Sequence, residues 1–92
     1  MKRICDHLDF WVSSGSPIVR HNKASNVWEN LHKEVAGIEI NETFWQAVDS
    51  IELTSCDLLD CFDEVSDKLP LQGTYWDSLK HAMKIWSNLF RV

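Results

Sequence analysis

The chain has 92 residues, a net charge of −5 and a hydrophobic content of 45%. This length allows one domain, so we predict a single domain over residues 1–92. The apolar content is typical of a globular protein and argues against a disordered chain. No apolar run approaches the roughly 20 residues that a membrane-spanning helix needs.

The cysteines and the start of the chain bear on the cellular compartment. The chain has three cysteines, an odd number, and Lys2 and Arg3 are not followed by the apolar stretch of a secretory signal. Reduced thiols fit a cytoplasmic protein best, and we therefore predict a cytoplasmic location.

The first part of the chain has two regions with helical spacing of apolar residues. The first covers residues 3–13 and ends at a stretch rich in Ser, Gly and Pro. Asn26 followed by Glu29 resembles a capping box and predicts that the second helix begins there. Gly37 suits the position just after the end of this helix.

Two short stretches alternate or carry β-branched residues. They are residues 18–21 and residues 38–40. We predict that they form, at most, a minor two-strand accessory.

The centre of the chain predicts a long helix over residues 42–69. Asn41 is a suitable N-cap, and Pro70 stops the helix. The apolar positions step by four and three, with Ser55 at one missing step; they are Phe44, Val48, Ile51, Leu58, Phe62, Val65 and Leu69. Thr54 and Asp57 offer an alternative, because they can cap a new helix and break the long one near Leu53. The uninterrupted apolar spacing favours continuity.

The last helix is predicted over residues 74–91, where apolar residues again step by three and four. The connection from residue 69 to residue 74 is short, so these two helices are expected to form an antiparallel hairpin. The predicted fold is therefore all-α, with about four helices.

The long helix also carries a concentration of acidic residues. Residues 38–67 contain nine acids and no Lys or Arg. At about 100° per residue, the acids of the long helix lie within about 140° of one another, nearly opposite the apolar seam. Trp45 lies beside them and has the character of a binding anchor. The candidate partner-binding residues are Trp45, Asp49, Glu52, Asp57, Asp60, Asp63, Glu64 and Asp67.

Three interpretations of this acidic face are open. It is solvated, or it is paired within the chain, with Lys80 near Glu64 and Lys84 near Asp60, or it docks a basic partner. Docking would let the carboxylates take the place of phosphates on a nuclease or another nucleic-acid-binding protein. The acidic face itself would repel nucleic acid.

The functional hypothesis from sequence is a small inhibitor of the immunity, antitoxin or phage anti-defence type. One alternative is a helical adaptor that self-associates through its apolar seam, so the chain is a monomer or a homodimer. A second is a regulator that binds nucleic acid through its basic ends, with Lys2, Arg3, Lys80, Lys84 and Arg91 clustered.

The sequence predicts no enzyme, cofactor or metal site. The acids of residues 57–67 include D-x-x-D spacings, but no second acidic segment faces them to complete a magnesium site. No nucleophile elbow, P-loop or dinucleotide-binding fingerprint is present. The four histidines lie outside any recognisable motif.

Overall fold

The computed structural model describes residues 1–22 and 24–91, which form four helices: α1 (Lys2–His7), α2 (Val27–Asp49), α3 (Leu58–Lys68) and α4 (Thr74–Leu89). No strand occurs in these residues. The predicted all-α fold with about four helices is therefore confirmed. In the same residues, no helix has the length and apolar character that crossing a membrane would require.

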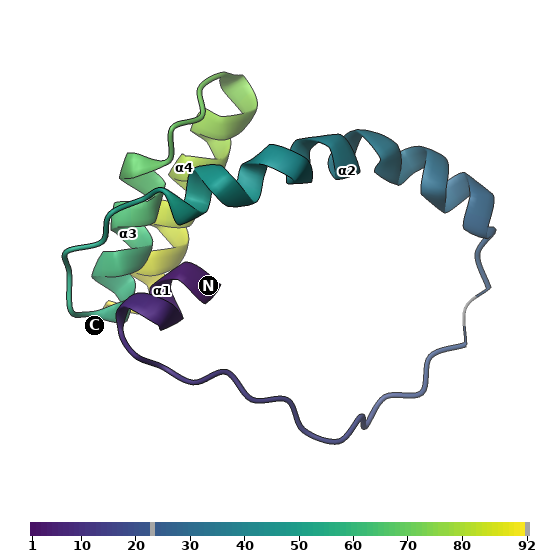
Figure 1. Ribbon diagram of the computed structural model, residues 1–92, viewed down its shortest axis with the longest axis horizontal. Helices are drawn as coiled ribbons and strands as arrows, with labels where there is room; N and C mark the ends of the chain where they lie inside the picture. The colour runs from purple at the N-terminus through teal and green to yellow at the C-terminus, as the bar shows by residue number, and fades with distance from the viewer. Residues whose placement is uncertain (23, 92) are drawn as a thin grey trace.

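Helices α3 and α4 lie side by side as a hairpin (Figure 1). Their side chains pair in antiparallel order. Asp67, near the end of α3, bonds to Lys84, whereas Asp60, near the start of α3, bonds to Arg91. Pro70 follows α3, and Gly73 precedes α4 with a φ of 120° that favours glycine. The predicted antiparallel hairpin is confirmed.

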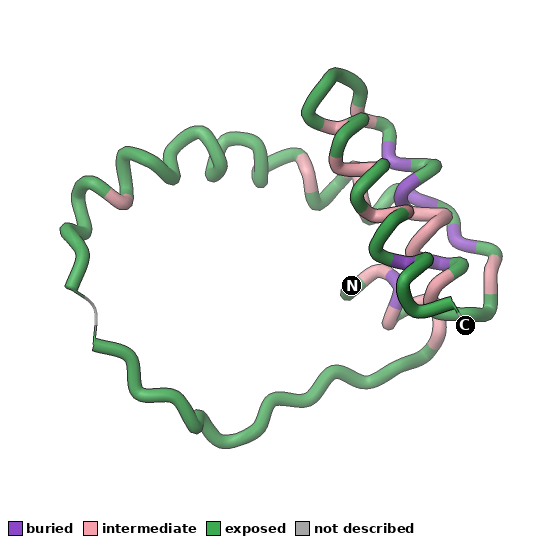
Figure 2. Tube along the Cα trace, turned by 180° about the vertical axis from the view of Figure 1, so that it is seen from behind, coloured by how far each residue is buried: buried purple, intermediate pink, exposed green. Residues whose placement is uncertain are grey.

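The buried side chains are concentrated at one side of the molecule. Figure 2 marks the buried residues in purple, and they lie in α1, in α3, in α4 and in the chain that leads into α3. The most buried apolar residues are Ile4, Ile51, Leu53, Cys61 and Leu69. We call α1 together with residues 44–91 the compact unit.

Aromatic contacts join the C-terminal part of α2 and the hairpin. The rings of Phe44 and Trp76 stack with centroids 5.6 Å apart, and those of Phe62 and Trp86 lie 4.8 Å apart. Such pairs contribute about 0.5–1.5 kcal/mol each beyond their burial. The first pair joins α2 to α4 and fixes the position at which α2 leaves the hairpin, and the second joins α3 to α4 within the hairpin.

The remainder of the chain leaves the compact unit and returns to it (Figure 1). Residues 9–22 are irregular, and α2 then runs back toward the hairpin as one long helix. We call residues 9–22 and 24–40 the open arm. Nearly all of its described residues are exposed, as the green tube in Figure 2 shows.

The prediction of one helix over residues 42–69 is wrong. Residues 50–57 are not helical, and Asp57 instead caps α3, because one of its carboxylate oxygens accepts hydrogen bonds from the N–H groups of Leu59 (2.9 Å) and Asp60 (3.3 Å). The alternative break near Leu53 is the arrangement observed. Ile51 and Leu53 are buried from an irregular segment rather than from a helical seam.

The predicted two-strand accessory does not form. Residues 38–40 lie inside α2, which continues through Gly37, and residues 18–21 are irregular. The side chain of Asn26 accepts a hydrogen bond from the Trp28 N–H (3.0 Å) and sets the start of α2 as expected. One glycine costs only about 1 kcal/mol inside a helix, so Gly37 does not end it.

The first helix is shorter than predicted. It ends at His7, and Asp9 then adopts a φ of 57°, in the left-handed region. A residue in this conformation cannot continue a right-handed helix. The chain turns at this point, and Phe10 donates a backbone hydrogen bond to the Cys5 carbonyl (2.8 Å).

Candidate functional site

The structure divides the predicted partner-binding residues between two places. Trp45 and Asp49 lie near the end of α2, and Glu52 lies in the irregular segment that follows. The other five lie on α3 or at its cap; they are Asp57, Asp60, Asp63, Glu64 and Asp67. The eight residues therefore do not share one helix face.

The carboxylates along α3 form ion pairs with Lys84 of α4 and with Arg91, which follows α4. Lys84 Nζ lies 2.7 Å from Asp67, and one Arg91 nitrogen lies 2.8 Å from Asp60 and 2.9 Å from Asp63. Lys84 therefore reaches a different acid from the predicted Asp60, and Lys80 donates to the Leu71 carbonyl (3.0 Å) rather than approaching Glu64. The arrangement is internal pairing, with a register different from the one predicted.

Asp63 and Arg91 influence one another's pKa through this pairing. Burial opposes ionisation of Asp63, but the hydrogen bond from Ser87 (2.6 Å) and the cations of Lys84 and Arg91 outweigh it and hold the pKa of Asp63 below its ordinary value. The hydrogen bond to Asp60, together with Asp63, raises the pKa of Arg91. Both groups are therefore charged when the hairpin is folded.

Glu64 is bonded to the irregular segment that separates α2 from α3. Its carboxylate accepts from the backbone N–H groups of Thr54 and Ser55, both at 2.9 Å, and from both hydroxyl groups. The hydrogen bond from the Ser55 side chain, followed by those from Thr54, lowers the pKa of Glu64 from 4.5 to about 2. Glu64 thus holds residues 54–55 in a non-helical conformation.

The α3 carboxylates therefore have structural roles in the compact unit. Asp57 caps a helix, Glu64 organises a loop, and the others join α3 to α4. Asp60 and Asp67 nevertheless remain 59% and 65% exposed in their side chains. A role in binding a partner stays a prediction for all eight residues.

The other part of the predicted site borders a cleft between α1 and the end of α2. The cleft has a volume of about 410 Å³, and its lining includes Lys2, Arg3, Phe44, Trp45 and Asp49. The Arg3 guanidinium donates to the Ile51 carbonyl (2.8 and 3.1 Å), which fixes α1 to the irregular segment that follows α2. Trp45 is 59% exposed at this edge.

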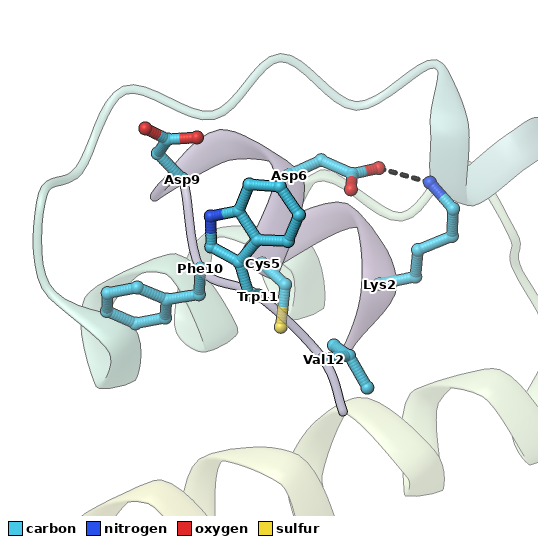
Figure 3. Close-up of a pocket in the computed structure, with 7 residues that line it drawn as sticks. All are labelled: Lys2, Cys5, Asp6, Asp9, Phe10, Trp11 and Val12. Atoms are coloured by element: carbon cyan, nitrogen blue, oxygen red, sulfur yellow. Dashed lines mark hydrogen bonds and ion pairs between the residues drawn. The ribbon is translucent and has the colours of Figure 1, made fainter. Parts of the chain in front are cut away.

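A second cleft lies where the chain turns back over α1 (Figure 3). It has a volume of about 420 Å³ and is lined by Lys2, Cys5, Asp6, Asp9, Phe10, Trp11 and Val12. Figure 3 shows the indole of Trp11 beside Cys5, and a hydrogen bond between Lys2 and Asp6. No sequence pattern predicts this cleft, because the apolar spacing of residues 3–13 predicts a helix there and Asp9 carries no turn motif.

Helix α2 carries a row of exposed apolar side chains that the sequence interpretation assigned partly to a short core helix. We call this row the α2 stripe; it consists of Val27, Leu31, Val35, Ile38 and Trp45, which are 44–60% exposed. The stripe occupies one side of α2, because its members are separated by three, four or seven residues. Phe44 and Val48 lie on another side of α2 and pack against the core. The helical spacing of these residues predicts the stripe, but only if the helix continues past Gly37, where the sequence predicts that it ends.

The irregular part of the open arm is also apolar and exposed. Trp11 is 94% exposed, Ile18 95% and Val19 80%. Single exposed apolar residues are common, but an exposed set of this size marks an interaction surface. The α2 stripe and this segment are therefore the candidate functional surface of the chain.

Comparison with known proteins identifies a family that matches over the whole chain. A model of the family described as reversibly glycosylated polypeptide matches residues 1–92. The chain is 38% identical over 92 residues to UDP-arabinopyranose mutase 1 of Arabidopsis thaliana, covering 94% of this chain and 26% of that protein. No solved structure gives a significant match.

Other relatives agree with this match. UDP-arabinopyranose mutase 2 of Arabidopsis thaliana is 39% identical over 94 residues, and UDP-arabinopyranose mutase 1 of Oryza sativa subsp. japonica is 38% identical over 98 residues. Each alignment covers 94% of this chain and 26% or 25% of the relative. The chain thus spans about a quarter of the length of the curated relatives that it matches.

These matches overturn the functional predictions from sequence. The prediction of an inhibitor of the immunity, antitoxin or phage anti-defence type is wrong, because the similar proteins are mutases. The prediction that the chain is not an enzyme is contradicted for the same reason, since its relatives are named as mutases. The inhibitor hypothesis depended on the docking interpretation of the acidic face, whereas Asp60, Asp63 and Asp67 form ion pairs within the chain.

Proposed function

The chain belongs to the reversibly glycosylated polypeptide family, and from this premise we propose that it works as the helical part of a UDP-arabinopyranose mutase. The observation that carries the proposal is the match of the family over residues 1–92, together with identities of 38% and 39% to proteins with that name. The substrate of the complete enzyme would be UDP-arabinopyranose.

The distribution of exposed and buried groups supports a role as one part of a larger enzyme. The compact unit has its own core and its own ion pairs, so it provides a folded support. The open arm carries apolar side chains without cover, including Trp11 and Ile18. Covering such residues is favourable by about 25 cal/mol per Å² of apolar surface removed from water. The remaining three-quarters of a family-length enzyme would supply that cover.

A chimaera tests this proposal. The matching stretch of UDP-arabinopyranose mutase 1 of Arabidopsis thaliana would be replaced by this chain, and consumption of UDP-arabinopyranose would be followed by chromatography of the nucleotide sugars. We expect a turnover within about tenfold of the parent enzyme, which corresponds to about 1.4 kcal/mol in the barrier.

The control is the same enzyme with a Gly/Ser linker of equal length in place of the stretch, which we expect to be inactive. A chimaera that is folded, as judged by a cooperative thermal transition, but converts no substrate would overturn the proposal. The parent enzyme measured alongside shows that the assay detects activity.

We also propose that the protein works in a reducing compartment such as the cytoplasm. Cys5, Cys56 and Cys61 are free thiols, and Cys61 is buried in the core, where burial raises the pKa of its thiol. A buried protonated thiol of this kind is unreactive. Fusion of the chain to a fluorescent protein would test this location in cells.

A further inference from the structure

The α2 stripe is a seam for packing against another helix, with the acid Glu42 in the gap between Ile38 and Trp45. At about 100° per residue, its five members lie within about 80° of one another around α2. From Val27 to Trp45 the seam is about 27 Å long, at roughly 1.5 Å per residue. This length and width match the contact surface of one amphipathic partner helix.

The charges beside the stripe are all negative on α2 itself. Glu42 and Asp49 lie inside the sector that the stripe occupies, and Glu34 lies about 20° beyond one of its edges. Lys33, the basic residue of α2, lies about 160° from the centre of the stripe. Among the described residues, no ion pair joins a base to Glu34 or Glu42.

The acids argue against a second copy of this chain as the occupant. Two antiparallel stripes would bring Glu34 of one copy close to the acids of the other, and like charges at such a seam are destabilising. Residues 9–22 do not cover the stripe either, because they arch away from α2 in Figure 1 and expose their own apolar residues. A basic border on the occupant would satisfy the acids.

We propose that the α2 stripe docks an amphipathic helix with a Lys- or Arg-rich border, supplied by the part of a family-length enzyme that this chain does not match. This inference rests on the proposed function, since the occupant belongs to the same enzyme. The apolar seam provides the affinity, and the acids at Glu34 and Glu42 set the orientation of the partner helix. Two bases lie near the Trp45 end of the seam, and both are already engaged: Lys2 is bonded to Asp6, and Arg3 donates to the Ile51 carbonyl.

Two isoleucines of α2 provide a matched pair of variants. Ile38 belongs to the stripe and is 49% exposed, whereas Ile40 lies about 200° around the helix and is 50% exposed. Ile38→Ser and Ile40→Ser would each be made in the isolated chain and in the chimaera with UDP-arabinopyranose mutase 1. The midpoint of thermal unfolding would be measured for all four proteins, with the unsubstituted chain and chimaera as references.

Docking predicts a loss that appears only in the chimaera and only at the stripe. We expect Ile38→Ser to lower the unfolding midpoint of the chimaera by about 5 °C more than it lowers that of the isolated chain. For Ile40→Ser the two decreases should agree within about 2 °C. Equal excess losses for the two variants, or none for Ile38→Ser, would overturn the inference.

A charge variant tests the basic border. Glu34→Lys with Glu42→Lys should lower the unfolding midpoint of the chimaera, and high salt should shrink this loss because it screens the ion pairs. Glu29→Lys is the control, because Glu29 lies about 140° around α2 from Glu34. It removes a favourable acid from the first turn of α2, so it should lower the unfolding midpoints of the isolated chain and of the chimaera alike. An unchanged midpoint for the double variant would overturn the basic border.

Unfolding rather than activity is the measurement, so the inference and the proposed function fail separately. A folded chimaera without turnover, in which Ile38→Ser still shows its excess loss, contradicts the function and supports docking. Sedimentation equilibrium of the isolated chain tests self-association. A dimer that Ile38→Ser dissociates would overturn the inference, because the occupant would be a second copy.

Discussion

The compact unit and the open arm contain similar apolar residues, but only the compact unit buries them. Ile4 and Ile51 are 2% and 3% exposed, whereas Ile18 in the arm is 95% exposed. The difference is the presence of partners, because the hairpin of α3 and α4 provides two helices that α1 and residues 50–57 can contact. The apolar character of a side chain therefore indicates that burial is favourable, but it does not indicate which part of the protein buries it.

The largest effect is expected from the core. Ile51→Ala should lower the free energy of unfolding by about 2–5 kcal/mol, because it removes methylene groups and leaves a cavity between α1 and α3. Urea unfolding followed by circular dichroism measures this loss. The matched control is Ile85→Ala on α4, where the side chain is 51% exposed and the loss should be clearly smaller. Similar losses at both sites would mean that the compact unit has no single core.

The next effect depends on pH and belongs to the loop that Glu64 holds. Since folding lowers the pKa of Glu64 from 4.5 to about 2, its stabilisation is complete above pH 4.5 and is lost as the pH falls through about 2. Glu64→Gln should therefore lower the urea midpoint near neutral pH and make its decrease between these two pH values shallower. Glu39→Gln, on exposed α2, controls for the loss of one negative charge. Parallel pH profiles for Glu64→Gln and the wild type would contradict this role.

A smaller effect distinguishes the two regions through their helix caps. Asp57→Ala removes the cap of α3 and should cost about 1 kcal/mol of global stability. Asn26→Ala removes the equivalent cap of α2, but in the open arm it should reduce helix content without moving the cooperative urea transition. A shift of that transition by Asn26→Ala equal to the shift by Asp57→Ala would show that the arm and the compact unit unfold together.

The smallest effect is expected in the irregular part of the arm. Ile18→Ser should change the free energy of unfolding of the isolated chain by less than about 0.5 kcal/mol, because the side chain contacts little. The same urea titration measures it. A loss above about 1 kcal/mol would mean that Ile18 packs against the compact unit in solution.

The predictable part of the fold is the part with local signals. The hairpin followed from two apolar stripes joined by a short connection containing Pro70, and the start of α2 followed from the Asn26 cap. Both signals act within a few residues of the structure that they specify. Periodicity and capping rules describe this range of interactions well.

The break between α2 and α3 was less accessible from sequence. The apolar spacing passes through residues 51–58 without a shift, so the pattern alone favours one helix. The observed conformation depends on Glu64, whose carboxylate reaches back nine and ten residues to Ser55 and Thr54. That contact requires the chain to turn between Ser55 and Glu64, and helical periodicity along the sequence does not predict it.

The candidate surface was predicted only in part. Trp45 is predicted from sequence as a binding anchor and is 59% exposed, but the sequence pattern groups the acids around it with those of α3, as if on one continuous helix. The bases that neutralise Asp60, Asp63 and Asp67 are Lys84 and Arg91, far along the sequence, and their register across the hairpin decides which acids remain unpaired. The sequence does not fix this register.

The attachment of α1 has a consequence for how the chain is held together. Arg3 and His7 each bond to a carbonyl 48 residues further along, at Ile51 and Ser55. Closing a loop of this size costs roughly 3 kcal/mol of entropy. Helix α1 thus behaves as a ligand on a tether, with an effective concentration in the millimolar range. A single cut after the exposed Arg20 would turn its docking into a reaction between two molecules, and dilution would then release it from the hairpin.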